Sequence, residues 1–282
     1  MQLRTHTPGP PLARHVEYLW HLRDVPGHAA ERVLPSGTLE LVINLAQDAF
    51  HVHTAAGSRQ LRGAIVSGVY TRFFSIDTRD HADVLGVHFR PGGAWPVLGV
   101  APGALADQHC ELEDLWGRTN VRRLREQLWA TPARERLSVF EAALAARCAD
   151  SWQLHSACSQ ALDALACGAR VTQVAAAAGL TSRRLQAVFQ QQVGTAPKLF
   201  ARLCRFQRAL GDLERTETPD WPELAQASGY FDQSHLIREF RAIAGCAPTE
   251  LTRARHVPVK EHHLALPGSS DSSNTQKPTG AR

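Results

Sequence analysis

Polar side chains, mostly arginine and glutamine, recur at helical spacing in two segments of the chain. They are Arg183, Gln186 and Gln190 in the first segment, and Gln233, Ser234 and Arg238 in the second. In the major groove of DNA, arginine can donate two hydrogen bonds to one guanine, and glutamine can form two with one adenine. The pattern thus predicts two helix faces that read base edges. Such residues more often lie on a solvated face, so the prediction depends on where these helices stand in the fold.

The two segments belong to an internal repeat. Val174-Ala175-x-x-x-Gly179, then Leu185, Phe189, Gly194 and Pro197, match Leu224-Ala225-x-x-x-Gly229, then Leu236, Phe240, Gly245 and Pro248. The intervals from Ala to Gly, Leu to Phe, Phe to Gly and Gly to Pro are 4, 4, 5 and 3 in both copies. Only the interval from Gly to Leu differs. Matched spacing at this many positions indicates a duplicated supersecondary unit.

Each copy has the pattern of a helix-turn-helix. Short apolar helices are expected over 171–178 and 222–228, each ended by a glycine that can adopt the left-handed conformation. A polar residue then begins a second helix, which is Thr181 or Ser182 in the first copy and Asp232 in the second.

The second helix of each copy has one apolar face. Leucine and phenylalanine four residues apart lie on one side of a helix, where they attach it to the core and leave the opposite side free for DNA. A separate helix from Lys198 to about Leu210, roughly 20 Å long, is expected to hold the two units apart. Two such units on one side of B-DNA would meet major grooves about 34 Å apart.

The excess of basic residues lies in the same part of the chain. Residues 170–255 hold 12 lysines and arginines against 8 acidic residues, whereas residues 1–169 hold 16 against 17. The net charge of the chain is +4. This excess is modest, so it agrees with a polyanionic partner without requiring one.

The first part of the chain has a different residue pattern. Short apolar segments rich in strand formers are separated by Gly, Pro and Ser, which is typical of antiparallel sheets. They cover residues 15–20, 38–45, 50–54 and 83–89, and helical patterns follow at 112–116, 120–129 and 133–147. The predicted class is α+β, with an N-terminal β-barrel or sandwich carrying helices, then an all-α domain of two helix-turn-helix subdomains. The predicted domains are 11–147 and 152–256, followed by a disordered tail over 257–282.

Residues 155–254 resemble the AraC-type DNA-binding domain. The matching pieces are Val174-Ala175-x-x-x-Gly179-Leu180-Thr181-x-Arg183-x-Leu185, Gly194-Thr195-Ala196-Pro197-x-x-Phe200, and Gly229-Tyr230-Phe231-Asp232-Gln233-Ser234-His235-Leu236-x-Arg238-x-Phe240. The resemblance implies two reading helices, control of transcription, and base-facing residues at Arg183, Gln186, Ala187, Gln233, Ser234 and Arg238. Two departures stand out: Ala187 replaces a long polar side chain, and Phe231 replaces a capping Ser, which leaves the cap to Asp232.

The predicted DNA-contacting set is larger than these base-facing positions. Arg184 is expected to contact phosphate or solvent, and Gln190 and His235 complete the set. Arg205 and Asp212 have two alternative roles, which are contact with DNA or a DNA-binding partner and ion pairs within the protein. The ion pairs are favoured, because most such pairs are structural. The predicted partners are double-stranded DNA and RNA polymerase, with a small-molecule effector and a second copy of the chain as further candidates.

Residues 11–147 look like a less characterised domain that precedes such DNA-binding units. The likeness lies in Leu34-Pro35-Ser36-Gly37-Thr38-Leu39-Glu40-Leu41, Phe89-Arg90-Pro91-Gly92 and Leu112-Glu113-Asp114-Leu115-Trp116-Gly117, with Ser36 in place of a more usual Asp. It implies a cupin-like sensor and names no ligand. The N-terminal domain either binds an effector or only dimerises and contacts polymerase. Val121, Leu124 and Leu128 either form a dimer seam or cover the sheet.

A metal-dependent enzyme or sensor is the alternative. His51 and His53 share one face of a strand, and His88 lies on a later strand, which invites a metal site. A cupin site also needs a carboxylate soon after the histidine pair, yet Thr54-Ala55-Ala56-Gly57-Ser58 follows. The sequence also has no nucleophile elbow, P-loop or dinucleotide fingerprint. We therefore expect no catalytic residues, no metal and no cofactor.

Composition points to a protein of the cytosol. No apolar run reaches the roughly 18 residues that suggest a membrane span, and the start of the sequence does not read as a signal peptide. The six cysteines are scattered without a C-x-x-C pair. They are expected to be reduced thiols.

Overall fold

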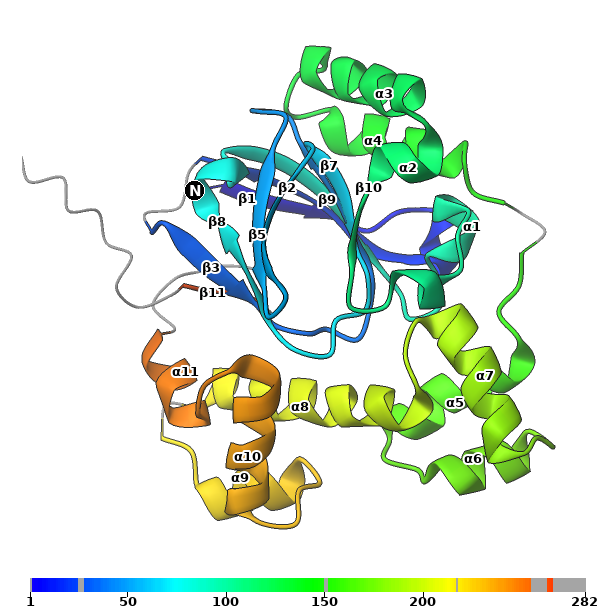
Figure 1. Ribbon diagram of the computed structural model, residues 1–282, viewed down its shortest axis with the longest axis vertical. Coiled ribbons are helices and arrows are strands. Elements are labelled where there is room, and N and C mark those ends of the chain that lie inside the picture. The colour runs from blue at the N-terminus through cyan, green and yellow to red at the C-terminus, as the bar shows by residue number, and fades with distance from the viewer. Residues whose placement is uncertain (1, 25–27, 150–151, 217, 255–262, 266–282) are drawn as a thin grey trace, which may run out of the picture.

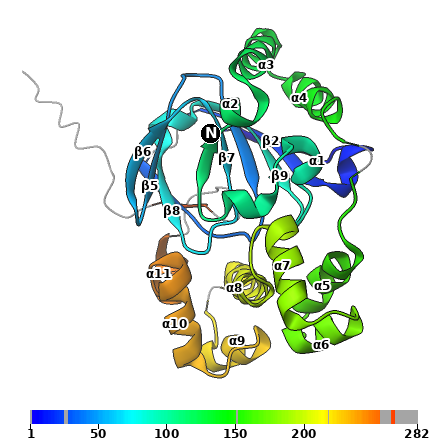
Figure 2. The same cartoon turned by 45° about the vertical axis from the view of Figure 1, so that its right-hand side comes forward.

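An antiparallel β-structure precedes, along the chain, a set of helices joined by one long helix (Figure 1). The computed structural model describes residues 2–24, 28–149, 152–216, 218–254 and 263–265. The long helix α8 (Pro197–Arg215) crosses one end of the β-structure, and the other C-terminal helices lie at its two ends in Figure 1 and Figure 2. The predicted α+β class, β-rich first and helical second, is confirmed.

Six strands form the larger sheet, in the order β1-β2-β9-β4-β7-β10. They are β1 (Gln2–His6), β2 (Val16–Arg23), β9 (Asp83–Phe89), β4 (Glu40–Asn44), β7 (Ala64–Ser67) and β10 (His109–Glu111). All neighbouring strands run antiparallel. The sequence predicts β2, β4 and β9, and it misses β1, β7 and β10, which are short or largely exposed.

Five strands form the second sheet, in the order β11-β3-β8-β5-β6. They are β11 (His263–Ala265), β3 (Ala30–Val33), β8 (Phe74–Asp77), β5 (Phe50–Thr54) and β6 (Gly57–Leu61). Of these only β5 is predicted by its alternating pattern. The two sheets face each other across a core that contains Trp20, Val42 and Phe50.

The larger sheet is covered on both faces, which explains its continuous apolar runs. On β4, Leu41 and Ile43 pack in one core, and Val42 packs in the core between the sheets. Successive side chains of a strand point to opposite faces, so burial of both faces requires apolar residues at every position. Gly86 on β9 makes room for Trp20, since a Cβ there would lie 2.0 Å from the indole ring.

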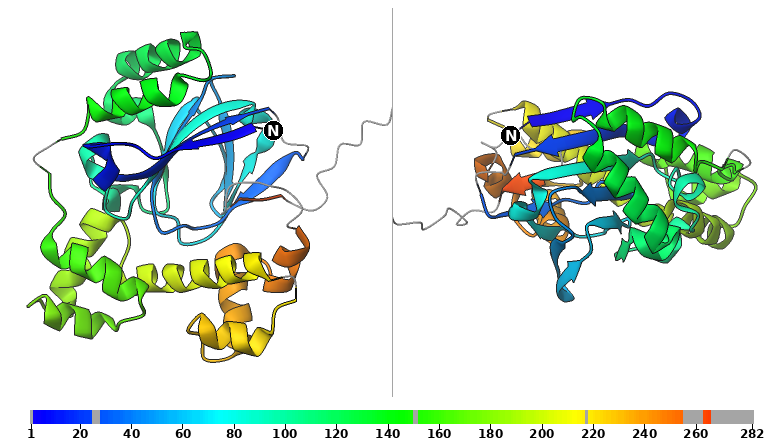
Figure 3. Two further views of the ribbon diagram at one scale, coloured as in Figure 1. Left: turned by 180° about the vertical axis from the view of Figure 1, so that it is seen from behind. Right: turned by 90° about the horizontal axis from the view of Figure 1, so that it is seen from above.

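Helices cover the outer face of the larger sheet (Figure 3). They are α1 (Trp95–Leu98), α2 (Leu112–Trp116), α3 (Arg118–Ala130) and α4 (Arg136–Ala145). The β-structure also has three short 3-10 turns, η1 (Leu12–Arg14), η2 (Thr78–His81) and η3 (Pro102–Leu105), of which η2 contacts β3 of the second sheet. Val121, Leu124 and Leu128 are all buried in the core under α3. Of the two roles open for this stripe, covering the sheet is the correct one, and the dimer seam is wrong because the side chains already have partners. We call β1 to α4 the β-domain.

The C-terminal helices fall into two units joined by α8. They are α5 (Ser156–Ala166), α6 (Val171–Ala177) and α7 (Ser182–Val193) before it, and α9 (Trp221–Ala227), α10 (Gln233–Ala244) and α11 (Pro248–Ala254) after it. The linking helix is longer than predicted. Its 19 residues span about 28 Å. Among the described residues, no helix combines the length and apolarity needed to cross a bilayer.

The two units differ in how their cores are connected. Leu185 and Phe189 of the first unit pack in a core of their own, made by α5, α6, α7 and the start of α8. Leu236 and Phe240 of the second unit belong instead to a core that continues through α8 into the β-domain. The second unit is therefore the one whose core is continuous with that of the β-domain.

The β-domain contacts the C-terminal end of the second helix in both repeats. Gly194 and Gly245 end α7 and α10 in the left-handed conformation, with φ of +95° and +72°. A Cβ on Gly194 would lie 3.0 Å from Val69, and one on Gly245 would lie 2.2 Å from the Phe73 ring. These glycines thus allow the close approach of one β-domain segment to equivalent points of the two repeats.

Hydrogen bonds reinforce the contact at the second unit. The Phe73 amide donates to the Ile243 carbonyl at 2.8 Å. The Arg32 guanidinium donates to the Ala244 carbonyl at 2.9 Å and lies over the Phe73 ring. The α10 end carbonyls, which no helical amide reaches, are therefore satisfied by the β-domain.

The end of the described chain returns to the β-domain. The strand β11 pairs antiparallel with β3 and falls within the tail that the sequence predicts to be disordered. His263 Nδ1 lies 2.9 Å from the buried Glu31 carboxylate, and His28 lies on its other oxygen at 2.7 Å. Burial would raise the pKa of Glu31, but these imidazole partners lower it to about 2. The prediction of disorder is wrong for His263–Ala265, because an open edge strand and a buried carboxylate supply partners that sequence composition does not show. The other predicted tail residues lie outside the described residues.

Candidate DNA-binding interface

The helices α7 and α10 stand second in the two repeated units, and we call them the reading helices. Each begins at a side chain that accepts a hydrogen bond from a free backbone amide. Thr181 Oγ1 accepts from the Arg184 amide at 3.2 Å, and Asp232 Oδ1 accepts from the His235 amide at 2.6 Å. Such caps satisfy amides that have no partner within the helix. Of the alternatives for the first copy, Thr181 is the cap, and Asp232 caps the second copy as predicted.

The apolar face of each reading helix is fully buried, and the opposite face is open. Leu185 and Phe189 on α7, like Leu236 and Phe240 on α10, are 0% exposed. The predicted contact residues on the open faces are exposed at Arg183, Arg184, Gln186, Ala187, Ser234 and Arg238, and half-buried at Gln233. The structure therefore brings these side chains to the surface in two equivalent places.

Two predicted contact residues stand apart from the open faces. The half-buried Gln190 lies in the last part of α7, where its backbone carbonyl closely approaches Gly103 of the β-domain. The His235 ring is half-buried and packs edge-on against Tyr230 at 5.3 Å between centroids. Its Nδ1 also lies 3.4 Å from the Phe231 amide. His235 thus belongs to the start of α10 rather than to its open face.

The sequence prediction misses Phe231 as a surface residue. Its side chain is 91% exposed and directly precedes the Asp232 cap. An apolar residue at this position usually packs back onto the first turn of the helix. Here Leu236, which occupies the expected partner position, is already enclosed in the core. In the sequence, position 231 is marked by a phenylalanine where the family that the chain resembles often has a capping serine.

The predicted ion pairs of α8 are partly wrong. Asp212 pairs with Arg215, three residues away on the same helix. Arg205 instead donates to the Gly229 carbonyl at 3.1 Å and lies over the Tyr230 ring. The guanidinium therefore bridges α8 to the turn of the second unit without a carboxylate.

The histidines of the metal alternative have separate partners. His51 lies 3.0 Å from Asp80 and His53 lies 3.0 Å from Asp77, both carboxylates that come from other parts of the chain. His88 is on β9 in the other sheet and bonds to Thr38 at 3.0 Å. In the described part of the chain, no three His, Cys, Asp or Glu side chains are grouped as a metal site would require.

The space between the two sheets is small and mostly apolar. A cavity of about 30 Å³ is lined by residues that include Trp20, Glu40, His81 and His109. Burial lowers the pKa of His109 to about 3, so this imidazole is neutral near pH 7, and it bonds to the Tyr70 hydroxyl. The space is enough for about one water molecule.

Two family models match separate parts of the chain. Residues 4–111 match a domain of unknown function (DUF6597), and residues 174–254 match a helix-turn-helix domain. No curated protein matches the chain.

Solved structures of ToxT from Vibrio cholerae are similar to this chain. The P21 form is 8% identical with a TM-score of 0.45, covering 90% of this chain and 98% of that one. Wild-type ToxT with bound unsaturated fatty acid is 9% identical with a TM-score of 0.46, covering 89% and 94%.

The helix-turn-helix match contains both reading helices and α8. It spans 174–254, which begins within α6 and ends with α11. The repeat, the two caps and the two open faces lie inside it, at the positions that carry the resemblance described above. Residues 174–254 of the chain therefore belong to a helix-turn-helix domain of the AraC type.

Proposed function

We propose that this chain is a DNA-binding transcription regulator of the AraC family, and that it recognises a specific DNA sequence through both reading helices. The observation that carries the proposal is the paired geometry: the same face of α7 and of α10 is open, while the opposite face of each is fully buried. The amino-terminal parts of second helices in such units enter the major groove. The two helices are held by one continuous helix, so they can address one duplex together.

The side chains on these faces divide by chemistry. Arg183 and Arg238 are suited to two hydrogen bonds with guanine, and Gln186 and Gln233 to two with adenine. Ala187 is suited to contact with a thymine methyl group, and Ser234 accepts or donates one hydrogen bond. Arg184 lies outside this pattern, and we assign it to phosphate. Gln190 and His235 are assigned to holding the ends of their helices.

The full chain is expected to bind duplex DNA with an affinity that falls steeply as salt rises. Phosphate contacts release counterions, so log K falls linearly with log salt, by about 0.9 for each contact. Fluorescence anisotropy with a labelled duplex, titrated at several salt concentrations, measures this slope. A site selected from random duplexes should bind more tightly than its shuffled sequence. Absence of duplex binding even at low salt contradicts the proposal.

We also propose that the β-domain responds to a small-molecule effector. It is joined to the second reading helix by hydrogen bonds at Ile243 and Ala244, so a change in the β-domain has a direct route to α10. The cavity between the sheets is too small for a metabolite as it stands, so binding there requires side chains to move. Domain limits at 11–147 and 152–256, RNA polymerase contact and pairing with a second copy stay predictions.

A metabolite thermal-shift screen tests the effector proposal. A ligand bound only by the folded protein raises its melting temperature. A hit should also change the affinity for the selected DNA site, since coupling between two sites is reciprocal. A β-domain that only positions the reading helices would give neither effect.

Elemental analysis of the purified protein is expected to find no stoichiometric transition metal. His51 and His53 are each held by a different carboxylate, and His88 lies in the other sheet. One zinc, iron or manganese per chain, lost on His51→Ala, would contradict this expectation and favour the metal-dependent alternative.

A further inference from the structure

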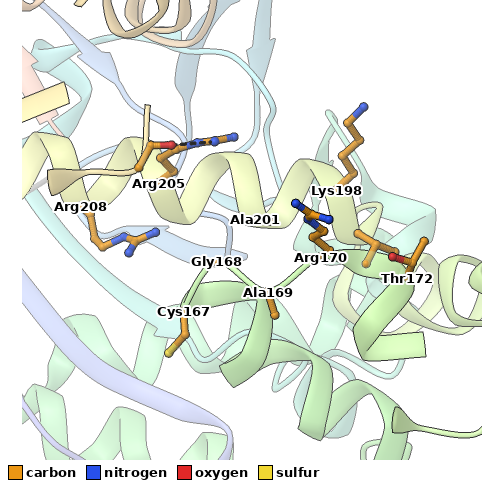
Figure 4. Close-up of a pocket in the computed structure, with 11 residues that line it drawn as sticks. Cys167, Gly168, Ala169, Arg170, Thr172, Lys198, Ala201, Arg205 and Arg208 are labelled. Atoms are coloured by element: carbon orange, nitrogen blue, oxygen red, sulfur yellow. Dashed lines mark hydrogen bonds between the residues drawn. The ribbon is translucent and has the colours of Figure 1, made fainter. Parts of the chain in front are cut away.

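A cleft of about 490 Å³ lies between the two helix-turn-helix units, along one side of α8. Figure 4 shows the residues that line it, which come from α8, from the segment before α6 and the first turn of α6, and from the turn after α9. Four of them are cations: Arg170, Lys198, Arg205 and Arg208. No aspartate or glutamate is among the lining residues. The charge of this lining therefore favours an anionic ligand.

The cleft exists because α8 has two different sides. Lys198, Arg205 and Arg208 recur at intervals of seven and three residues, which places them on one side of a helix. The opposite side carries Leu203 and Phe206, both 0% exposed. The helix is thus fixed to the protein by its apolar side and presents a row of cations on the other.

The guanidinium of Arg205 is held in place. It donates to the Gly229 carbonyl at 3.1 Å, as the dashed line in Figure 4 marks, and lies 5.2 Å from the centre of the Tyr230 ring. Its Nε is buried and has no hydrogen-bond partner among the described residues. Arg205 therefore supplies an ordered positive charge in the row of cations on α8, and an anion in the cleft is attracted to that point.

The other three cations are exposed. No ion pair of Arg170, Lys198 or Arg208 occurs within the described residues, although α8 forms such pairs elsewhere, at Arg202 with Glu239 and at Arg215 with Asp212. Unpaired cations on one surface repel each other, and an anionic ligand relieves that repulsion.

We propose that this cleft binds the phosphate backbone of the DNA between the two points where the reading helices enter. This inference rests on the proposed function. It follows from position, since α6 and the turn at Gly229 belong to the two helix-turn-helix units, and the first helix of such a unit crosses the backbone. The base-reading residues then choose the sequence, and the cleft supplies affinity that does not depend on it.

The dimensions of the row agree with a DNA strand. Lys198 and Arg208 are ten residues apart, which is about 15 Å along a helix. Each DNA strand carries one phosphate for about every 3.4 Å of the duplex axis, so the row spans the length of about four phosphates.

The test compares two double variants of the full chain that lose the same charge. Lys198→Gln with Arg208→Gln removes two cations of the cleft, and Arg79→Gln with Arg123→Gln removes two exposed cations of the β-domain. Salt titrations with the selected duplex should show a slope lowered by about 1.8 in the cleft variant, and unchanged in the control. The order of preference among single-base variants of the site should stay the same.

Chemical protection gives a second readout. Cys167 is exposed at the edge of the cleft, and its alkylation by a maleimide can be followed by peptide mass spectrometry. Bound duplex should slow this alkylation at least several-fold in the wild-type chain. Equal slopes in the two double variants, together with unprotected Cys167, would show that DNA does not occupy the cleft.

Inorganic triphosphate distinguishes the two sources of phosphate. If the cleft serves a free phosphate ligand, calorimetry should detect triphosphate binding to the wild-type chain and none to the cleft variant. The salt slope of DNA binding would then be the same in the cleft variant as in the wild-type chain. This pair of results would contradict the proposal. A wild-type chain that binds no duplex would refute the proposed function itself. A wild-type chain that binds normally while both double variants behave alike refutes only the role of the cleft.

Discussion

Replacement of Leu236 by alanine is expected to lower the free energy of unfolding by about 2–5 kcal/mol, the range for truncating a fully buried leucine. Leu236 is 0% exposed and lies in the core that runs from the second helix-turn-helix unit through α8 into the β-domain. Because that core is continuous, the loss should appear in the main cooperative transition. Urea unfolding followed by circular dichroism measures it.

Leu185→Ala provides a matched comparison. Leu185 is equally buried at the equivalent position of the first repeat, but its core is separate. Its truncation should destabilise the first unit in a transition that precedes the main one. Ile237→Ala, at a half-buried neighbour of Leu236, should cost less than Leu236→Ala. Equal effects of Leu236→Ala and Ile237→Ala would mean that α10 is rotated from the orientation described here.

Arg238→Ala is expected to cost about 1–3 kcal/mol on the selected site and to relax the preference at one base pair. Arg238 is exposed on the open face of α10, opposite the buried Leu236 and Phe240. Its effect on non-specific DNA should be small, because only a contact with a base edge discriminates between sequences. Binding measured against each single-base variant of the selected site tests this.

Arg184→Ala controls for the loss of charge. Arg184 is exposed at the start of α7, and we assign it to phosphate. Its removal should weaken all sequences alike and lower the salt slope by about 0.9. If Arg238→Ala instead weakens every sequence equally, Arg238 is a phosphate contact. Specificity in the second unit would then rest on Gln233, Ser234 or the shape of the DNA.

Local patterns were sufficient to predict the reading helices. The spacing of Leu and Phe by four residues defines which side of each helix is buried, and glycines and capping residues define where helices end. These signals depend on neighbours within about two turns of the same helix. Asp232 as the cap of α10 was predictable for that reason, even though Phe231 beside it departs from the family pattern.

Contacts between distant segments were not predictable in this way. The stripe at Val121, Leu124 and Leu128 allowed a dimer seam or a sheet cover, and only the packing of α3 on the larger sheet decided between them. A metal site formed by His51, His53 and His88 was an alternative on the sequence alone, but strand order places His88 in the other sheet. Apolar periodicity shows that a face is buried and does not show what buries it.

What the sequence by itself determined is the repeated unit, its caps and the phase of its helices, because these follow from side chains a few residues apart. The tertiary structure alone decided what surrounds that unit. It placed Gly194 and Gly245 against the β-domain, and it brought Arg170, from the segment before α6, and Arg205, from α8, into one cleft. Such groupings depend on how the chain crosses itself, and residues brought together from far apart leave no common spacing in the sequence.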